Sequence, residues 1–146
     1  MAGNIQTARL APVGIASNQG LVMADATVGS ARLVALSVLN PGMGVHAGWT
    51  LERVREDRDG DIYRIRNDDM GLYLTMSEGD QVNSRVLGGV LSPDPHLIPT
   101  QEWRFISQGS NRVSWASRSG LRMHPDSHEP GATVYLVSGG NDVWEY

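Results

Sequence analysis

The feature of this chain that most constrains its fold is a short pattern that occurs three times. The copies are Gly20-Leu21-Val22-Met23, Gly71-Leu72-Tyr73-Leu74 and Gly120-Leu121-Arg122-Met123, with glycines 51 and 49 residues apart. A recurring period of this length indicates similar units that share one core, because a single unit cannot bury its own apolar face. At 146 residues the chain is long enough for one such core.

Apolar segments surround each copy in the same order. One segment before the glycine covers residues 8–10, 62–66 and 112–115, one after it covers residues 32–36, 85–91 and 133–137, and the repeats close on Trp49, Trp103 and Trp144. Most segments alternate apolar with polar side chains over about five residues, which predicts strands. Helical periodicity is nearly absent because glycine and proline interrupt it. The sequence therefore predicts one all-β domain over residues 1–146, with twelve short strands in three repeats near 5–53, 54–107 and 108–146.

Three four-stranded repeats that each close on a tryptophan resemble the ricin-B-type β-trefoil lectins, in particular the fruiting-body and sclerotial lectins of fungi. The repeat of that family ends in Gln-x-Trp, which Gln101-Glu102-Trp103 matches, whereas Ala47-Gly48-Trp49 and Asp142-Val143-Trp144 depart from it. The resemblance covers nearly the whole chain and implies a β-trefoil fold. We expect the closing tryptophans, and Trp115 with them, to lie in the core, because an indole buries a large apolar area.

The resemblance also implies sugar pockets, in which polar side chains meet the hydroxyls of a pyranose and an aromatic ring packs on its apolar face. The third repeat carries the best-equipped set: His124, Asp126, Tyr135, Asn141 and Asp142. It departs from the pattern of the family in two ways. The usual carboxylate position holds His124, so Asp126 is offset by two residues, and the usual aromatic position falls on Val137.

The other two repeats are weaker sugar-binding candidates. The first offers Asp25, Ser37, Asn40 and His46 but has no aromatic residue on its second strand. The second has Thr75 in place of the carboxylate and Gly88-Gly89 in place of the sugar platform. We therefore expect no sugar in the second repeat, and a role for Gln101 in tying down a turn.

Composition excludes several classes of protein. The chain has no cysteine and no lysine, so disulfides, thiolate nucleophiles and Schiff-base chemistry are impossible. Its net charge of -4 argues against a general nucleic-acid binder. No apolar run approaches the ~20 residues that a membrane span needs. No nucleophile or metalloprotease motif is present, so we expect neither catalysis nor a cofactor.

A metal site near the third repeat is not expected either. His124, Asp126 and His128 have metal-binding side chains, but their spacing suits a helix. Pro125 and Pro130 place them in a strand and loop instead, which favours a solvated loop.

The sequence therefore predicts a lectin for galactose or N-acetylgalactosamine-type glycans and glycoproteins, without catalysis, in fungal defence. Affinity per site would be weak because hydroxyls exchange water for protein at little net gain, and a homodimer would raise avidity. A cytoplasmic location is expected, because residues 1–20 make a poor signal peptide and the chain has no cysteine and no Asn-x-Ser/Thr sequon.

Two other functions remain open. A β-trefoil protease inhibitor would present one exposed loop to the enzyme, with Arg32, Arg58, Arg85 or Arg118 for a serine protease, or the Asn40–Gly44 segment for a cysteine protease. Alternatively, the eroded Gln-x-Trp motifs would suit a lectin-like interaction subunit that binds no sugar. Such a subunit should expose a large apolar patch.

Overall fold

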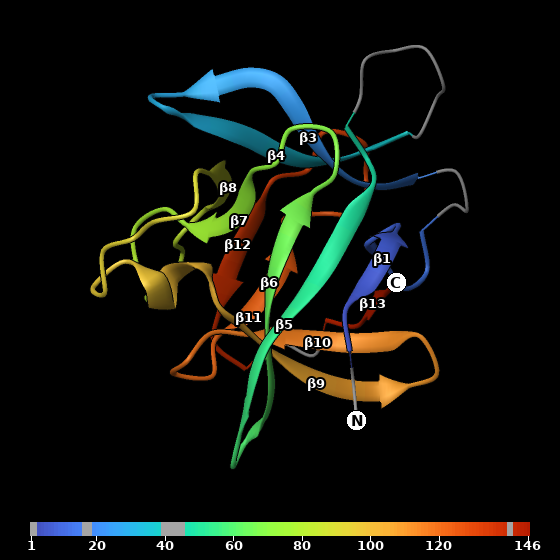
Figure 1. Cartoon of the computed structure of the whole chain (residues 1–146). Coiled ribbons are helices and arrows are strands. Elements are labelled where there is room, and N and C mark those ends of the chain that lie inside the picture. Colours follow the sequence, from blue (N-terminus) through green and yellow to red (C-terminus); the bar gives the residue numbers. More distant parts are fainter. Residues whose placement is uncertain (1–2, 16–18, 39–45, 140–141) are drawn as a thin grey trace.

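The computed structural model of the chain describes residues 3–15, 19–38, 46–139 and 142–146 (Figure 1). Within this part the protein consists of strands, turns and one short 3-10 helix, so the predicted all-β class is confirmed. No helix among these residues has the length and apolar character of a membrane span. The elements are β1 (Ile5–Ala8), β2 (Ala11–Pro12), β3 (Gln19–Val28), β4 (Ala31–Val38), β5 (Trp49–Asp57), β6 (Gly60–Asn67), β7 (Tyr73–Met76), β8 (Val86–Gly89), η1 (Ile98–Gln101), β9 (Trp103–Gly109), β10 (Arg112–Ala116), β11 (Arg122–Pro125), β12 (Val134–Val137) and β13 (Trp144–Glu145).

The first and last strands of each repeat form a closed barrel. Antiparallel pairings join β1 to β5, β5 to β6, β6 to β9, β9 to β10, β10 to β13, and β13 to β2. Because only Arg9 and Leu10 separate β1 from β2, these pairings complete a ring. The described residues contain 13 strands where twelve were predicted, since the single strand predicted at residues 8–10 is wrong: two short strands lie on either side of Arg9 and Leu10.

The two middle strands of each repeat form hairpins: β3 with β4, β7 with β8, and β11 with β12. The hairpins also pair with one another, through Ala35 with Thr133 and through Arg32 with Gly88. Figure 1 shows β3 and β4 at the top of the view and the barrel strands β9 and β10 at the bottom. Each repeat thus supplies two barrel strands and one hairpin, in the predicted order.

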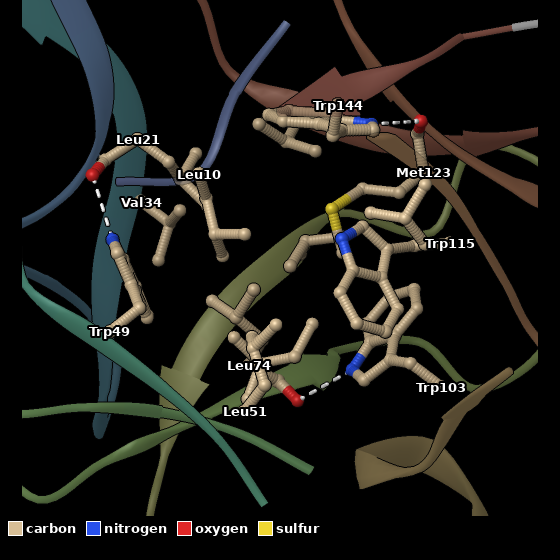
Figure 2. Close-up of a cluster of buried hydrophobic side chains, with 14 of the residues drawn as sticks. Leu10, Leu21, Val34, Trp49, Leu51, Leu74, Trp103, Trp115, Met123 and Trp144 are labelled. Carbon is tan, nitrogen blue, oxygen red and sulfur yellow. Dashed lines mark hydrogen bonds between the residues drawn. The ribbon is translucent and has the colours of Figure 1, made fainter. Parts of the chain in front are cut away.

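The closing tryptophans are core residues, as predicted. Trp49, Trp103 and Trp144 each have 0% exposure, and each indole Nε1–H donates to a backbone carbonyl of the hairpin in its own repeat (Figure 2). The acceptors are Leu21 O at 2.8 Å, Leu74 O at 3.2 Å and Met123 O at 3.2 Å. These bonds satisfy the only polar atom of each buried side chain and fix the barrel to its hairpins.

The hydrogen bonds of the tryptophans correct the predicted register of the first repeat. They align Leu21 with Leu74 and Met123, whereas the sequence pattern aligned Met23 with that pair. Gly71 and Gly120 are turn residues with φ of 68° and 95°, but Gly20 lies inside β3, paired with Ser37. The recurring Gly-Leu dipeptide therefore has a turn role in two repeats only, and the first repeat is shifted by two residues.

Trp115 is also buried, at 0% exposure, and occupies a position where the other repeats have smaller residues. In β10, Trp115 precedes Ala116, which pairs with Arg122. In β6, Ile65 likewise precedes Arg66, which pairs with Tyr73, so Trp115 and Ile65 hold equivalent positions. The larger ring packs edge-on against Tyr63 and Phe105, with centroid distances of 6.0 and 5.4 Å. The third repeat therefore adds an aromatic cluster that the threefold pattern does not require.

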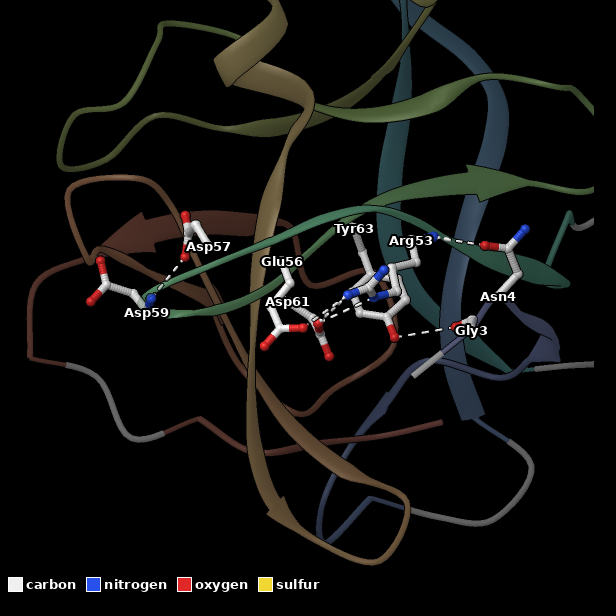
Figure 3. A network of polar contacts seen from close by, with 8 residues as sticks. All are labelled: Gly3, Asn4, Arg53, Glu56, Asp57, Asp59, Asp61 and Tyr63. Carbon is white, nitrogen blue, oxygen red and sulfur yellow. Dashed lines mark hydrogen bonds and ion pairs between the residues drawn. The ribbon is translucent and has the colours of Figure 1, made fainter. Parts of the chain in front are cut away.

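Hydrogen bonds fasten the N-terminal segment to the β5–β6 hairpin, which an ion pair braces internally (Figure 3). Arg53 N donates to Asn4 Oδ1 at 2.8 Å, and Tyr63 OH donates to Gly3 O at 3.2 Å. The Arg53 guanidinium lies 3.1 Å from the Asp61 carboxylate on the neighbouring strand. The start of the described chain is thereby held against the barrel wall.

Asp80 links the second and third repeats. Its carboxylate accepts hydrogen bonds from Ser119 N at 2.8 Å and from Ser119 Oγ at 2.7 Å. Burial alone would raise the pKa of Asp80, but the hydrogen bonds from Ser117 and Ser119 outweigh that effect, so its pKa lies below the ordinary value of 3.8. The folded state therefore favours the ionised carboxylate.

Replacing Trp103 with alanine should lower the free energy of unfolding by about 3–5 kcal/mol, because it leaves a cavity in the core and an unpaired Leu74 carbonyl. Denaturant unfolding monitored by circular dichroism measures this. Trp103→Phe, which keeps most of the apolar volume and loses only the Nε1–H donor, should cost clearly less. Equal losses in the two variants would show that packing contributes little.

Replacing Asp80 with asparagine should lower the melting temperature at neutral pH. The difference from the wild type should shrink as the pH falls below the ordinary value of 3.8, because a lowered native pKa stabilises the fold only while the carboxylate is ionised. Thermal unfolding across this pH range measures the effect. Asp126→Asn removes the same charge at an exposed position and serves as the control; a loss that persists undiminished in acid would contradict the prediction.

Candidate functional site

The structure brings together two of the residues predicted to bind sugar in the third repeat. His124 in β11 places Nδ1 2.6 Å from Asp142 Oδ2, just before β13. Tyr135 is the cross-strand partner of His124, and its hydroxyl accepts a hydrogen bond from Thr133 Oγ1 at 2.8 Å. The pair of His124 and Asp142 is half-buried, with 39% and 19% of the side chains exposed. One carboxylate oxygen of Asp142 is therefore already paired within the protein.

The third-repeat set does not line a single cavity. Tyr135 lines a hollow of about 460 Å³ that Asn83 and Arg85 share, whereas Asp142 lines another of about 250 Å³ beside Val13. Asp126 is exposed, and its backbone N–H donates to Thr133 O at 2.8 Å. Asn141 lies outside the described residues. A sugar ring bound at this position would occupy one of the two hollows and would not find Tyr135 and Asp142 in the same cavity.

The first-repeat set is only partly described. Asp25 and Ser37 lie in β3 and β4, but their side chains are outside the described part, and Asn40 is outside it entirely. His46 pairs with Met23, and its Nδ1 lies 3.3 Å from Asp69 Oδ2. The carbohydrate contacts predicted for these residues stay a prediction.

The second repeat holds a cavity of about 510 Å³, larger than the hollows at the third repeat. Its walls come from β7, from the segment between β8 and η1, and from η1 itself. The lining residues are Thr75, Met76, Ser77, Glu78, Gly79, Gly89, Val90, Ser92, His96, Leu97, Thr100 and Gln101. The sequence predicted no binding site here.

Gln101 fixes one wall of this cavity and is 2% exposed. Its Nε2 donates to Thr75 Oγ1 at 3.1 Å and to Val90 O at 2.8 Å, and its Oε1 accepts from Ser92 N at 2.9 Å. Both amide hydrogens and one acceptor position are therefore used. The prediction that Gln101 ties down a turn is confirmed, and the turn it holds is a wall of the cavity.

Gly89 allows a close approach between β8 and β7 at the cavity. A Cβ atom at this position would lie 3.0 Å from Thr75 Oγ1 and 3.8 Å from Gln101 Nε2, which is too close for ordinary packing against Thr75. The sequence pattern predicts the loss of a sugar platform at Gly88-Gly89. In the structure, the missing side chain at Gly89 lets the strand pack tightly beside Thr75 and Gln101.

The rim of the cavity combines polar and apolar groups. His96 is exposed, and its imidazole makes no hydrogen bond within the described part of the chain. The Glu78 carboxylate is also exposed, while Val90 and Leu97 expose 78% and 50% of their surface. Such a rim offers donors and acceptors for hydroxyls and an apolar surface for the C–H face of a small ring.

These rim residues could have been located from the length of the second repeat. Its interval from Gly71 to Trp103 is 32 residues, the longest of the three. The additional chain, with Pro93, Pro95 and Pro99, forms the segment that walls the cavity. The intact Gln-x-Trp motif and this long segment belong to the same repeat.

Several solved structures are similar to this chain. A designed threefold-symmetric protein, ThreeFoil, is 20% identical, with 99% of this chain and 97% of ThreeFoil covered and a TM-score of 0.68. A mosquitocidal holotoxin is 13% identical with a TM-score of 0.73, and an exo-β-1,3-galactanase from Clostridium thermocellum is 19% identical with a TM-score of 0.68. The chain is a β-trefoil.

At these identities the similarity shows the fold alone. The match covers 99% of this chain but 17% of the holotoxin, and 96% of this chain but 29% of the galactanase. No protein-family model and no curated protein matches the sequence. The β-trefoil predicted from the three repeats is confirmed.

The pseudo-symmetry of the β-trefoil relates the second and third sites. Gln101 and Asp142 each lie two residues before a closing tryptophan, and each contacts the equivalent hairpin residue, Thr75 or His124. Ala47 holds the corresponding position in the first repeat. Two repeats of this β-trefoil therefore have a polar link between hairpin and closing strand.

Replacing Gln101 with alanine should lower the free energy of unfolding by about 1–3 kcal/mol, because it leaves Val90 O and Ser92 N without their partner. Denaturant unfolding measures the loss. Gln108→Ala removes an exposed amide that donates to Ser114 Oγ at 3.2 Å and should cost less. Equal stability of the Gln101 variant and the wild type would mean that the turn does not depend on this amide.

Proposed function

We propose that this β-trefoil is a carbohydrate-binding protein without catalytic activity, and that the cavity of the second repeat is its main site. The observation that carries the proposal is the cavity of about 510 Å³ beside the intact Gln101-Glu102-Trp103 motif. Its rim offers the His96 imidazole and the Glu78 carboxylate for hydroxyls, and Val90 and Leu97 for the apolar face of a sugar.

The expected ligands are galactose or N-acetylgalactosamine-type glycans and the glycoproteins that carry them. Support comes from the resemblance of the repeats to fungal ricin-B-type lectins and from the similarity in fold to a galactanase. A defence role, a cytoplasmic location and a homodimer that raises avidity belong to the same proposal. Because the residues that line the cavity include no phenylalanine, tyrosine or tryptophan on which a sugar could stack, we expect weak binding per site.

The geometry favours a carbohydrate over a serine protease as the partner. Arg58 lies in the tight turn between Asp57 and Gly60, which pair with each other, and Arg118 lies in a turn closed by a hydrogen bond from Gly120 N to Ser117 O. Arg32 and Arg85 take part in strand pairings. Of these four arginines, only Arg58 and Arg118 are therefore exposed on turns, and both turns are short.

The other two alternatives have less to support them. The Asn40–Gly44 segment, the candidate for cysteine proteases, lies outside the described residues. The interaction subunit without sugar binding would need an apolar patch, and the exposed Val90, Leu91 and Leu97 lie in the segment that walls the second-repeat cavity. The assays below separate these functions.

A glycan-array screen followed by calorimetric titration with the best galactoside tests the proposal. His96→Ala should weaken binding about tenfold, because it removes one hydrogen bond to the sugar and the apolar area of the ring. Asp126→Ala should leave binding unchanged, and unchanged melting temperatures would show that both variants are folded.

The opposite pattern, with loss in Asp126→Ala alone, would place the sugar in the third repeat. A blank array combined with inhibition of trypsin or papain would overturn carbohydrate binding in favour of protease inhibition. Failure of both assays would favour the interaction subunit.

A further inference from the structure

A second cavity, of about 270 Å³, lies in the wall of the barrel and shares no lining residue with the first. Its lining is unusually rich in charge for its size. The residues are Arg55, Asp57, Ile62, Pro99, Glu102, Arg104 and Arg118. They come from β5, β6, η1, β9 and the turn after β10, so the cavity lies at a junction of the second and third repeats.

The back of this cavity is a buried ion pair. Glu102 is 7% exposed, and the two terminal nitrogens of Arg55 lie 2.9 Å from its two oxygens. Arg64 approaches the same carboxylate at 3.9 Å. The hydrogen bond that Arg55 donates to Glu102 raises the pKa of Arg55. Because both carboxylate oxygens are paired with Arg55, Glu102 acts as a fixed anchor for Arg55, which keeps 43% of its side chain exposed.

A second pair forms one side of the cavity. The Arg104 Nη2 atom lies 3.4 Å from Asp57 and 3.7 Å from Asp59, while its buried Nε has no hydrogen-bond partner. The hydrogen bond from Asp59 N and the nearby Arg104 guanidinium lower the pKa of Asp57. Asp57 therefore remains a carboxylate that can accept hydrogen bonds from a ligand.

Arg118 supplies a cation that is available to a ligand. It is exposed, and it has no ion pair within the described residues. Its backbone lies in a rigid turn, because Gly120 N donates to Ser117 O at 3.0 Å and Asp80 holds the neighbouring Ser119. Asp80 attracts the Arg118 guanidinium through space, but it makes no ion pair with it and accepts its hydrogen bonds from Ser119, so Arg118 can still bind an anion at the cavity.

The lining arginine that has no ion pair indicates the ligand. Of the three arginines that line the cavity, Arg55 is paired with Glu102 and Arg104 with Asp57, whereas Arg118 has no ion pair within the described residues and suits a monoanion. A planar carboxylate matches the donor fork of arginine, whereas a phosphate dianion would meet the carboxylates of Asp57 and Glu102. Asp57 can accept hydrogen bonds from hydroxyls, and Ile62 and Pro99 add an apolar wall. The volume is slightly below the usual range for ligand pockets, about 300–1,000 Å³, and fits one ring.

We propose that this cavity is a second binding site, specific for a carboxylate-bearing sugar unit of the hexuronate class. Arg118 binds the carboxylate of the sugar, and Asp57 accepts hydrogen bonds from its hydroxyls. The proposal rests on the proposed carbohydrate-binding function, because it extends the ligands from neutral galactosides to acidic glycans. The site lies apart from the sugar positions that the repeats of the family predict.

Titration of the full chain with D-glucuronate and D-galacturonate tests this site. The wild type should bind at least one of them and bind D-glucose much more weakly, because glucose lacks the carboxylate. Arg118→Gln should weaken uronate binding about tenfold or more. The matched control is Arg58→Gln, which removes the same charge from the exposed tip of the β5–β6 hairpin and should leave binding within about twofold.

Three results would overturn the proposal. They are equal losses in the two arginine variants, equal binding of glucose and glucuronate, and stronger binding of inorganic phosphate than of either uronate.

His96→Ala separates the two proposed sites. Uronate binding that survives in this variant while galactoside binding is lost supports two sites. Galactoside binding by a wild type that binds no uronate refutes the second site alone, and uronate binding by a wild type that binds no galactoside refutes the first alone.

Discussion

The hydrogen bond from each closing indole to a hairpin carbonyl is the interaction on which the other features of this β-trefoil depend. The barrel strands and the hairpins belong to separate layers, and backbone pairing alone would leave their relative position loosely fixed. Trp49, Trp103 and Trp144 fill the space between the layers and also pair with a defined carbonyl. Because a buried N–H without a partner is costly, each tryptophan permits only one register between its hairpin and the barrel. This register also determines which side chains line the cavities at the surface of the hairpins.

The fold could be predicted from the sequence because alternating apolar segments recur in the same order in all three repeats. Most strand positions, the order of the strands and the burial of all four tryptophans follow from alternation and from the size of the indole, whereas the strand predicted at residues 8–10 was misplaced between β1 and β2. The register of the first repeat could not be obtained in this way. Gly20 and Gly71 look alike in the sequence, but only Gly71 occupies a turn that requires a positive φ, and this difference is visible only in the backbone.

The candidate sites were harder to predict because they depend on which side chains already satisfy one another. His124 and Asp142 are the polar residues expected of a binding pocket, yet they bind each other at 2.6 Å. Gly89 and Thr75 looked like losses, but they pack closely beside Gln101 and, with a long proline-containing segment, line a cavity. A residue-by-residue comparison with a family motif records which groups are present. It does not record how much of their hydrogen-bonding capacity is left, or where a longer segment encloses a cavity.

The pairing of β13 with β2 has a consequence for the synthesis of the chain. Residues 144–145 provide the last strand of the barrel, and until they have left the ribosome β10 and β2 both present unpaired backbone edges. The first two repeats can form local hairpins during translation, but the ring cannot close before the third repeat is complete. A nascent chain stalled short of Trp144 would therefore be a template for pairing with other chains, whereas the finished barrel closes these two edges against each other.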